Sequence, residues 1–408
     1  MAINTKYDVC IIGGLGHVGL PLGLSLADSG KRVVLYDINR KWIDMVSAGQ
    51  MPFIEEGAPE VLKRVIGKNL FVSGDKGSIS ESRYVVVIIG TPVDEHLNPK
   101  FSLFKNFFAD ILDYLKDGQH ILLRSTIYPG TTEKLKQYLE KNGKQLKLSF
   151  CPERIAQGKA VEELRSLPQI VSAFDEESFR EAEDLFSVLT KTIIRLTPTE
   201  AEFAKLFTNS WRYIQFAIAN QFYQMATEQG LDFYRIYDAI TYKYPRAANF
   251  PRAGFAAGPC LFKDTMQLAA RSNNSFFLGH SAMLVNEGLP NFIVQRLKEK
   301  YSIKDKVVGI LGMTFKADND DIRESLSFKL KKLLQIEARK VLFSDPYLKA
   351  ADCAPAVPDD ERPVGMQELI DGSDLIVLAT IHKEYKNIDT KGKPVVDIWN
   401  YHGHGGLF

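Results

Sequence analysis

The sequence has few cysteines, and they lie far apart. Cys10, Cys151, Cys260 and Cys353 are the four in 408 residues. Their separation matches neither a metal-ligand spacing nor the close pattern of a disulfide scaffold. We therefore expect no bound metal ion and a reducing, cytoplasmic setting for the chain.

Long apolar runs and an excess of one charge are also missing. The longest apolar run, around Val85–Gly90, is far shorter than the roughly 20 residues that a membrane-spanning helix needs. The polar stretch Met1–Asp8 shows no signal peptide. Lys and Arg number 51 and Asp and Glu number 50, so the formal net charge is +1. This balance gives no electrostatic basis for binding nucleic acid or an anionic membrane, and we expect neither partner.

An α/β pattern runs through most of the chain. The length predicts two or three domains, and the 45% hydrophobic content is typical of a globular protein. Short apolar, β-branched runs of the kind that form buried parallel strands alternate with segments of helical spacing. In the first half of the chain the expected strands are Val9–Ile12, Lys31–Asp37, Leu70–Val72, Tyr84–Ile89, Ile121–Leu123 and Leu146–Phe150.

The first two expected strands flank a turn with the spacing G-x-G-x-x-G. Gly14 permits a tight turn, Gly16 lets the backbone approach a pyrophosphate, and Gly19 lets the helix pack closely on the strand. The N-terminus of that helix then faces the phosphates. Asp37 ends the second strand, where a carboxylate binds the ribose hydroxyls and repels a 2′-phosphate. The motif predicts an NAD site, and the alternative is a βαβ turn with a purely structural role.

Polar residues follow several of these strands directly. They include Thr91, Ser125, Thr126 and Glu153. Because open parallel sheets bind ligands at the carboxyl ends of their strands, these residues are candidates for a binding or catalytic site. The alternative is that they cap helices or stabilise turns.

A long uninterrupted helix is predicted from Glu200 to about Gly230. Its interior contains neither Pro nor Gly, and at 1.5 Å per residue it would be about 45 Å long. Such a helix can link two domains and present a dimer surface. Lys205 and Asn209 are four residues apart and share one face, where together they could hold a developing oxyanion. The alternative is a solvated polar face.

One cysteine lies in a turn of small residues, Gly254–Cys260, just before Lys263 and Asp264. Small residues let a ligand approach closely, and the charge of Lys263 favours the thiolate. Asp264 could position or deprotonate a water molecule. The alternative is a tight turn around a buried, inert thiol.

The strand pattern resumes in the last third of the chain and predicts a second, smaller α/β domain without a glycine triplet of its own. Lys316 and Arg323 follow its first strand and are candidates for binding phosphate or carboxylate. Arg323 could instead pair with its acidic neighbours. The expected strands are Lys306–Leu311, Val341–Asp345, Leu375–Thr380 and Val395–Ile398.

Together these segments resemble the UDP-glucose/GDP-mannose dehydrogenase family over nearly the whole chain. The order and spacing of the motifs carry the resemblance, rather than any single motif. The motifs are Gly14–Gly19, Gly90–Pro92, Ser125-Thr126 with Pro129–Thr131, Pro152–Arg154 with Gly158, Glu202–Leu206 with Asn209, Cys260 with Lys263-Asp264, Phe315-Lys316, Asp321–Ser325 and Asp345-Pro346.

The resemblance implies a fold of two Rossmann-like doubly wound domains joined by a long central helical region. Residues 1–197 would bind NAD, 198–300 would form a central helical dimerisation domain with the catalytic cysteine, and 301–408 would bind the UDP-sugar. It also implies a homodimer. The implied reaction is the oxidation of a sugar C6 alcohol to a carboxylate in two hydride transfers, for the synthesis of polysaccharide precursors.

The same resemblance implies roles for individual residues. Cys260 would capture the C6 aldehyde as a thiohemiacetal, which the second oxidation converts to a thioester. Lys205 and Asn209 would stabilise oxyanions, Asp264 with Thr126 would position water, and Glu153 would act as acid and base. The expected cofactor-binding residues are Gly14, Gly16, His17, Val18, Gly19, Asp37, Thr91, Ser125, Thr126, Lys263 and Arg323. The expected substrate-binding residues are Glu153, Lys205, Asn209, Arg246, Arg252, Gly254 and Lys316.

Two departures from the family pattern leave the hexose open. The family usually has Gly-Phe-Gly-Gly-Ser-Cys before the nucleophile, whereas here the stretch is one residue longer and carries Ala256 and Ala257 in place of glycines. In addition, Cys151 stands where many members have Asn. We expect UDP-glucose as the substrate. The alternatives are UDP-N-acetylglucosamine or UDP-N-acetylmannosamine, then GDP-mannose, or a sugar-nucleotide-binding protein without catalysis.

Overall fold

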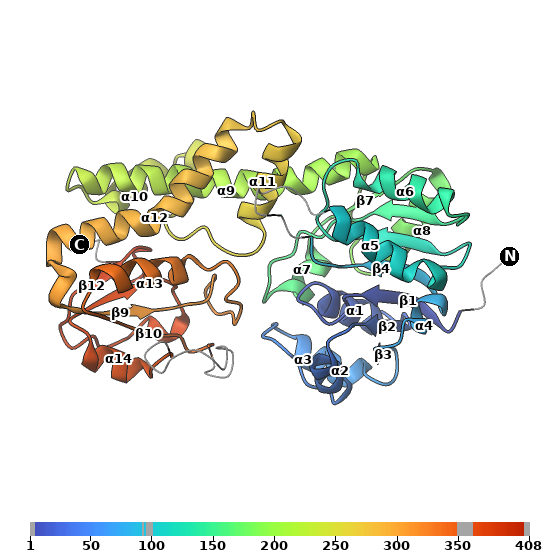
Figure 1. The fold of residues 1–408 in the computed structure, drawn as a ribbon, viewed down its shortest axis with the longest axis horizontal. Coiled ribbons are helices and arrows are strands. Elements are labelled where there is room, and N and C mark those ends of the chain that lie inside the picture. The colour runs from blue at the N-terminus through green and yellow to red at the C-terminus, as the bar shows by residue number, and fades with distance from the viewer. Residues whose placement is uncertain (1–4, 92–93, 95–100, 349–361, 404–408) are drawn as a thin grey trace. The chain divides into compact units, whose positions relative to one another are not determined.

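The computed structural model describes residues 5–91, 94, 101–348 and 362–403 (Figure 1). It separates into two compact units, Met1–Thr208 and Asn209–Phe408. The boundary falls within a long helix, α9 (Pro198–Glu228). The division into domains 1–197, 198–300 and 301–408 stays a prediction.

The first unit is built on an eight-stranded sheet with the order β3-β2-β1-β4-β5-β6-β7-β8. All neighbouring strands are parallel except β6 and β7. The first six strands follow the order of a dinucleotide-binding doubly wound fold, in which ligands bind where the order reverses, beside β1 and β4. The strands are β1 (Tyr7–Ile12), β2 (Val33–Tyr36), β3 (Leu70–Ser73), β4 (Ser82–Val87), β5 (His120–Leu123), β6 (Lys147–Phe150), β7 (Gln169–Ala173) and β8 (Ile193–Leu196).

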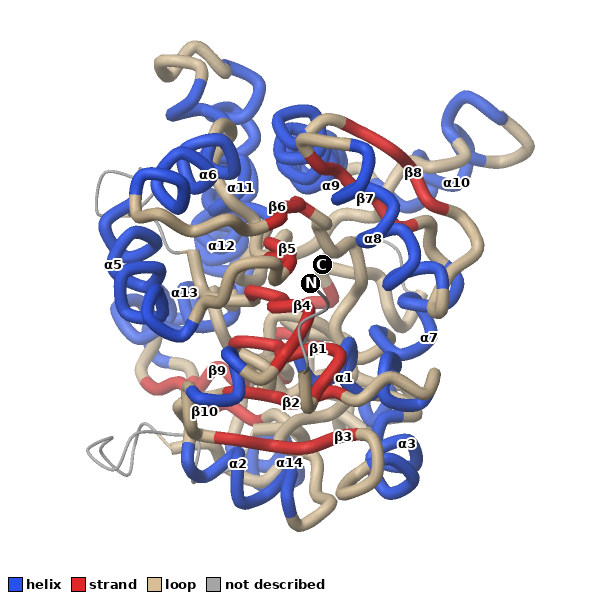
Figure 2. Tube along the Cα trace, turned by 90° about the vertical axis from the view of Figure 1, so that its right-hand side faces the viewer, coloured by secondary structure: helices blue, strands red, loops and turns tan. Residues whose placement is uncertain are grey.

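Helices cover both faces of this sheet, with α5 and α6 on one side and α1, α3, α7 and α8 on the other (Figure 2). Alternate side chains of β1 belong to the two resulting cores: Val9 and Ile11 to one, Cys10 and Ile12 to the other. Burial on both faces explains why the strands are almost continuously apolar. The helices are α1 (Gly19–Asp28), α2 (Arg40–Ser47), α3 (Ala58–Val65), α4 (Gly77–Ser80), α5 (Phe101–Ile111), α6 (Thr131–Lys141), α7 (Ala160–Ser166) and α8 (Glu176–Ser187).

A buried carboxylate from α9 holds the N-terminus of α6. Glu202 accepts hydrogen bonds from the backbone N of Gly130 (2.6 Å), the backbone N of Thr132 (2.8 Å) and the Thr132 hydroxyl (2.6 Å). Backbone N–H groups at a helix start have no partner within the helix, so a carboxylate there satisfies them and complements the helix dipole. Burial raises the pKa of Glu202, and its hydrogen bonds oppose that shift. This contact fixes the Pro129–Thr131 segment after β5.

The second unit contains a four-stranded parallel sheet with the order β10-β9-β11-β12. Its core joins the sheet to α12 and α13 through residues such as Ile310, Leu289 and Leu330. The strands are β9 (Val307–Leu311), β10 (Lys340–Ser344), β11 (Leu375–Leu378) and β12 (Val395–Asp397). The helices that lie wholly in this unit are α10 (Phe233–Thr241), α11 (Leu261–Arg271), α12 (Phe277–Tyr301), α13 (Leu326–Glu337) and α14 (Met366–Gly372).

The predicted fold class is confirmed, with two α/β sheets and the long helix α9. Each predicted strand is present, but β7 and β8 have no predicted counterpart. In β7 the polar residues Gln169 and Ser172 interrupt the apolar run, and both are buried and hydrogen-bonded, Ser172 to the carbonyl of Phe150 (2.7 Å). Within the described residues, every helix is too short or too polar to span a bilayer.

We predict that Glu202→Ala lowers the free energy of unfolding by about 2 kcal/mol or more, because two buried backbone donors lose their acceptor. Urea denaturation measures this loss. Glu200→Ala is the matched control, because Glu200 accepts from the backbone N of Thr197 (2.8 Å) on the exposed surface of the same helix. Its loss should be about 0.5–1 kcal/mol. Equal losses of unfolding free energy for the two variants would show that burial does not increase the contribution of this helix cap to stability.

Candidate active site

The glycine-rich turn after β1 forms a cradle with positions that no side chain could occupy. Gly13 has a φ of +72°, and a Cβ on it would stand 1.9 Å from the carbonyl oxygen of Ile88. A Cβ on Gly19 would stand 2.4 Å from the Gly13 oxygen. The left-handed residue of the turn is Gly13. Gly14 also lies in the turn, where a Cβ would stand 2.7 Å from the Ile11 oxygen and 2.9 Å from the Cα of Leu35 on β2. Its role in permitting the tight turn stays a prediction.

The same turn leaves space for a pyrophosphate. Only the Gly13 oxygen, at 3.7 Å, lies near the Cβ position of Gly16, so the backbone is open there. Val18 immediately precedes α1, whose N-terminus begins at Gly19, and the ring of His17 packs on Phe53 at 4.0 Å. These features fit a dinucleotide whose phosphates lie against the helix start.

Asp37 lies at the end of β2 and contacts the cradle directly. One carboxylate oxygen accepts from the backbone N of Leu15 (3.1 Å), and the other accepts from the backbone N of Asn39 (3.0 Å). The carboxylate is thus anchored within the turn that the glycines form. Its position matches that of the acid that binds ribose hydroxyls in NAD sites.

Hydroxyl groups tie the ends of β4 and β5 together. Thr91 donates to the carbonyl of Thr126 (2.6 Å), and the Ser125 hydroxyl accepts from the backbone N of Ile89 (2.7 Å). The Ser125 hydroxyl therefore stabilises a turn, which is one of the two roles considered for it in the sequence. Thr91, Ser125 and Thr126 lie together at the carboxyl edge of the sheet, where cofactor contacts are expected.

Glu153 and Lys205 form a largely buried ion pair in the first unit. Lys205 donates from Nζ to Glu153 Oε1 at 3.0 Å, and the two side chains are 5% and 13% exposed. The other oxygen of Glu153 accepts from the backbone N of Ile155 (2.9 Å). The solvated-face alternative for Lys205 is excluded, because its ammonium is buried against a carboxylate. This pair can exchange a proton with a bound hydroxyl group.

Asn209, Asp264 and Lys263 come together in the second unit. Asn209 Nδ2 donates to Asp264 Oδ2 at 2.6 Å, and Lys263 Nζ lies 3.0 Å from Asp264 Oδ1. Asp264 is completely buried and Asn209 is 5% exposed. Because Lys263 pairs with Asp264, the positive charge of Lys263 acts less strongly on a nearby thiol.

Cys260 immediately precedes α11 and is exposed, whereas Cys10 and Cys151 are buried. Burial raises the pKa of both Cys10 and Cys151 to about 12, so neither is a thiolate at neutral pH. A cysteine at a helix N-terminus has the opposite environment, because the helix dipole favours the thiolate. Cys353 lies outside the described residues. Of the described cysteines, Cys260 has the exposure that a nucleophile needs.

The turn before Cys260 is held by contacts that local sequence does not reveal. Asn220 on α9 donates to the Gly254 carbonyl (3.0 Å) and accepts from the Gly254 N (2.8 Å). The Gly258 N donates to the Glu324 carbonyl (3.2 Å), and a Cβ on Gly258, which has a φ of +100°, would meet the Phe315 ring at 2.6 Å.

The remaining candidate residues also lie in the second unit. Arg323 is fixed by Asp321, with NH2 2.6 Å from Oδ2. Hydrogen bonding to Asp321 chiefly raises the pKa of Arg323, and the charge of Cys260 acts in the same direction. Arg323 therefore forms the predicted salt bridge and also lies near Cys260.

The carbonyl of Lys316 accepts from the Thr314 hydroxyl (3.0 Å). Arg246 and Arg252 lie among aromatic rings, Arg246 donating to the Tyr244 hydroxyl (3.0 Å) and Arg252 lying over Tyr234 and Tyr237.

A dinucleotide cradle with an acid at the ribose position defines the first unit as that of an NAD-dependent dehydrogenase. The match to known families is more specific. Residues 7–190 match the NAD binding domain, 199–287 the central domain and 309–404 the UDP binding domain of the UDP-glucose/GDP-mannose dehydrogenase family. The chain belongs to this family, and it is an NAD-dependent nucleotide-sugar dehydrogenase.

Two relatives align with this chain over nearly its full length. A UDP-N-acetyl-D-mannosamine dehydrogenase of Methanococcus maripaludis is 30% identical over 403 residues, covering 95% of this chain and 90% of the relative. The enzyme of the same name from Pyrococcus horikoshii is 29% identical and covers 92% of this chain and 90% of its own.

Solved structures share the fold. The UDP-D-ManNAc dehydrogenase of Pyrococcus horikoshii has a TM-score of 0.85 at 27% identity, covering 94% of this chain and 91% of its own. A UDP-glucose dehydrogenase of Pyrobaculum islandicum has a TM-score of 0.87 at 24% identity, covering 97% and 95%. At that identity the second likeness establishes the fold alone.

We predict that Asp37→Ala raises the KM for NAD about tenfold to hundredfold, because a charged hydrogen-bond partner of the ribose is worth roughly 1.5–3 kcal/mol. Steady-state kinetics with NAD as the varied substrate measures the change. Asp8→Ala is the control, because Asp8 also accepts from a backbone N (Arg32, 2.8 Å) but at an exposed site. An unchanged KM in Asp37→Ala would contradict the assignment of the ribose site.

Proposed function

We propose that the chain is a UDP-N-acetylhexosamine 6-dehydrogenase, with UDP-N-acetyl-D-mannosamine as the first candidate substrate. The reaction type rests on the exposed Cys260 at the start of α11, in the unit that also contains the buried Asn209–Asp264 pair. The choice of sugar is supported by the relatives named UDP-N-acetyl-D-mannosamine dehydrogenase, which align with 92% and 95% of the chain. They favour this alternative over the UDP-glucose that we expected from the motifs.

In the first oxidation, Glu153 takes the proton of the C6 hydroxyl group as general base. Lys205, which donates to Glu153 at 3.0 Å, stabilises the negative charge that develops on the C6 oxygen. The glycine turn and Asp37 would hold NAD, which would supply the hydride acceptor for both oxidations. The first oxidation leaves an aldehyde at C6.

In the second half of the reaction, the Cys260 thiolate bonds to C6 of the aldehyde, and the carbonyl oxygen gains a proton to give a thiohemiacetal. Loss of the second hydride and a proton leaves a thioester. Asp264 positions the water that adds to this thioester, and Asn209, which donates to Asp264, stabilises the oxyanion. Expulsion of the thiolate frees Cys260. In total, one alcohol, one water and two NAD⁺ give one carboxylate, two NADH and three protons.

The groups proposed to hold the nucleotide sugar lie in the second unit. Lys316 is placed within the match to the UDP binding domain, which begins at residue 309, and we propose that it binds the sugar nucleotide. Arg323 lies in the same segment and is proposed to contact the cofactor. The remaining proposed contacts are Lys263 for the cofactor and Arg246, Arg252 and Gly254 for the substrate.

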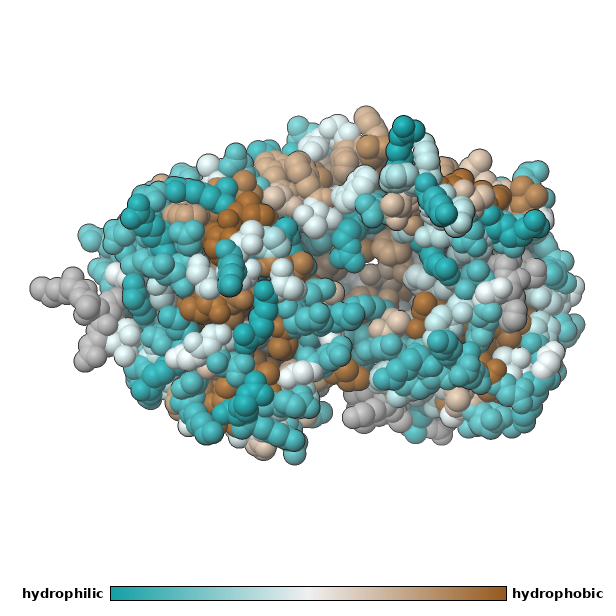
Figure 3. Space-filling model, turned by 180° about the vertical axis from the view of Figure 1, so that it is seen from behind, coloured by the Kyte–Doolittle hydropathy of each residue, from teal (hydrophilic) through white to brown (hydrophobic). Residues whose placement is uncertain are grey.

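We also propose that the chain forms a homodimer through α9 and α10. Large apolar side chains on these helices are exposed at spacings that place them on common faces. An exposed apolar surface of this kind typically marks an interface, and hydrophobic residues interrupt the mostly hydrophilic surface seen in Figure 3. The residues are Trp211 (59% exposed), Ile218, Phe222 (47%) and Met225 (55%) on α9, with Ile236 and Ile240 on α10.

We predict that UDP-N-acetyl-D-mannosamine gives the highest kcat/KM among four substrates: this sugar nucleotide, UDP-N-acetylglucosamine, UDP-glucose and GDP-mannose. Each molecule consumed should yield two NADH, measured by absorbance against chromatographic loss of substrate. A preference for UDP-glucose would overturn the sugar assignment. One NADH per sugar with a stable aldehyde would overturn the covalent scheme.

Cys260→Ser is the matched variant for the same assay. The serine hydroxyl is a far weaker nucleophile at neutral pH, so the variant should stop before the second oxidation. The buried Cys151→Ser variant controls for loss of a thiol elsewhere. If Cys260→Ser still released two NADH per sugar at the wild-type rate, Cys260 would not be the nucleophile.

We predict that Phe222→Glu weakens self-association at least tenfold, since a charge at the centre of an apolar interface costs about 1.4 kcal/mol or more. Light scattering after size-exclusion chromatography, over a range of protein concentrations, measures the change. Ile336→Glu is the control, because Ile336 is 79% exposed on a different helix, α13. A wild-type chain that is monomeric throughout would exclude the homodimer.

A further inference from the structure

Arg124 is a buried arginine that the proposed reaction does not use. It directly follows β5, is 2% exposed, and its guanidinium lies 5.2 Å from the centre of the Phe186 ring. No described carboxylate lies within ion-pair distance of Arg124, and its Nε makes no hydrogen bond to the described residues. Burying a cation without a counter-ion is costly, so its retention here requires an explanation.

The hydrogen bonds of Arg124 converge on the residues just before Glu153. Its NH1 donates to the carbonyl of Cys151 (3.1 Å) and to the side-chain oxygen of Gln169 (3.0 Å). Gln169 in turn donates to the carbonyl of Pro152 (3.1 Å). Arg124 and Gln169 together therefore hold the two consecutive peptide carbonyls that precede Glu153.

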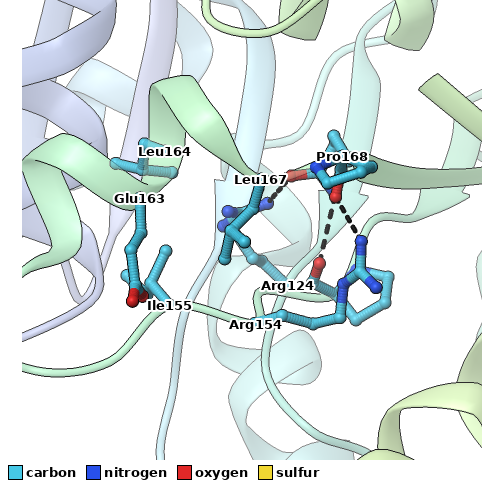
Figure 4. A pocket seen from close by; sticks show the side chains of 9 residues that line it. Arg124, Arg154, Ile155, Glu163, Leu164, Leu167 and Pro168 are labelled. Carbon is cyan, nitrogen blue, oxygen red and sulfur yellow. Dashed lines mark hydrogen bonds between the residues drawn. The ribbon is translucent and has the colours of Figure 1, made fainter. Parts of the chain in front are cut away.

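The other charged groups around Arg124 already have partners. Figure 4 shows the small pocket that Arg124, Arg154 and Glu163 line with Leu164, Leu167 and Pro168. Glu163 on α7 accepts from the backbone N of Ala156 (2.5 Å), and Arg154 donates to the carbonyl of Pro168. The cavity is about 10 Å³, enough for about one water molecule and too small for a phosphate. The pocket is therefore not a ligand site.

Glu153 supplies the missing negative charge. Burial lowers the pKa of Arg124, and the charge of Glu153 chiefly opposes that shift, with a smaller contribution from Cys151. Glu153 thus faces two buried cations, Lys205 from α9 and Arg124 from the end of β5, and only Lys205 bonds to it directly.

We infer that Arg124 is a positioning residue for Glu153: with Gln169 it fixes the two carbonyls before that residue, and so holds the Glu153 carboxylate against Lys205. The inference rests on the proposed role of Glu153 as general base. A base must lie within hydrogen-bond reach of the proton that it takes, so loss of these contacts should lower kcat without weakening the binding of NAD.

Three variants test these hydrogen bonds. Arg124→Met removes those of Arg124 and should lower kcat roughly tenfold to hundredfold, part of the 10²–10⁴ that a positioned base contributes. It should leave the KM for NAD within about twofold. Arg124→Lys keeps a hydrogen-bond donor and should recover part of the lost kcat. Gln169→Leu should lower kcat and also leave the KM for NAD within about twofold.

Arg195→Met is the matched control. Arg195 also lies over a phenylalanine ring, Phe179 at 4.2 Å, but it is exposed and pairs with Glu176 (2.7 Å). Its kcat should match that of the wild type. Wild-type kcat in folded Arg124→Met, or a KM for NAD that rises as much as kcat falls, would overturn the inference. If Arg124→Met does not fold, wild-type kcat in both Arg124→Lys and Gln169→Leu would overturn it.

A crystal structure of Arg124→Met distinguishes failure of this inference from failure of the proposed function. The expected change is a displaced Cys151–Glu153 backbone and loss of the 3.0 Å contact between Glu153 and Lys205. An unchanged backbone and contact would refute the positioning role whatever the activity. Separately, an unchanged kcat in Glu153→Gln would refute Glu153 as the base while leaving the structural result to stand on its own.

Discussion

The candidate functional residues of each unit depend on buried polar side chains along α9. Glu202, Lys205, Asn209 and Asn220 recur at helical spacing, and each is at most 5% exposed. A buried polar group is costly unless it is hydrogen-bonded, so each of these residues requires a partner in the unit to which it belongs. That requirement, rather than apolar packing, fixes the segments that carry the chemistry.

The partners of these side chains are the segments with proposed roles. In the first unit Glu202 holds the start of α6, and Lys205 holds Glu153. In the second unit Asn209 holds Asp264, and Asn220 holds Gly254 in the turn before Cys260. Arg124 acts in the same way from the end of β5, since it holds the carbonyl of Cys151. Backbone and carboxylate groups are thus set in place before any ligand binds, which is what electrostatic preorganisation requires.

The sequence allowed prediction of features that depend on neighbours in the chain. The central strands were predicted because burial on both faces leaves β-branched runs, and α9 because its interior lacks Pro and Gly. The pairs of Lys205 with Glu153 and Asn209 with Asp264 join residues 52 and 55 positions apart. Only the family resemblance, and no local pattern, indicated that such residues act together. The hydrogen bond between Arg124 and Gln169 joins residues 45 positions apart. The strand that carries Gln169, β7, was not predicted, because its buried polar residues interrupt the apolar pattern of a strand. The left-handed conformation of Gly13 was not predicted, and the carbonyl of Ile88 that crowds it follows a strand distant in the sequence.

The contact between Gly258 and Phe315 has a consequence for how this enzyme can diverge. A Cβ on Gly258 would stand 2.6 Å from the Phe315 ring, and Gly258 also donates to the carbonyl of Glu324. The segment that carries Cys260 is therefore packed directly against the segment that carries Lys316. A substitution that reshapes one segment for a new sugar must be matched by a change in the other. We therefore expect the sugar preference to change only when residues of both segments are replaced together. Replacing Ala256 or Ala257 alone by glycine would not introduce the specificity of another family member.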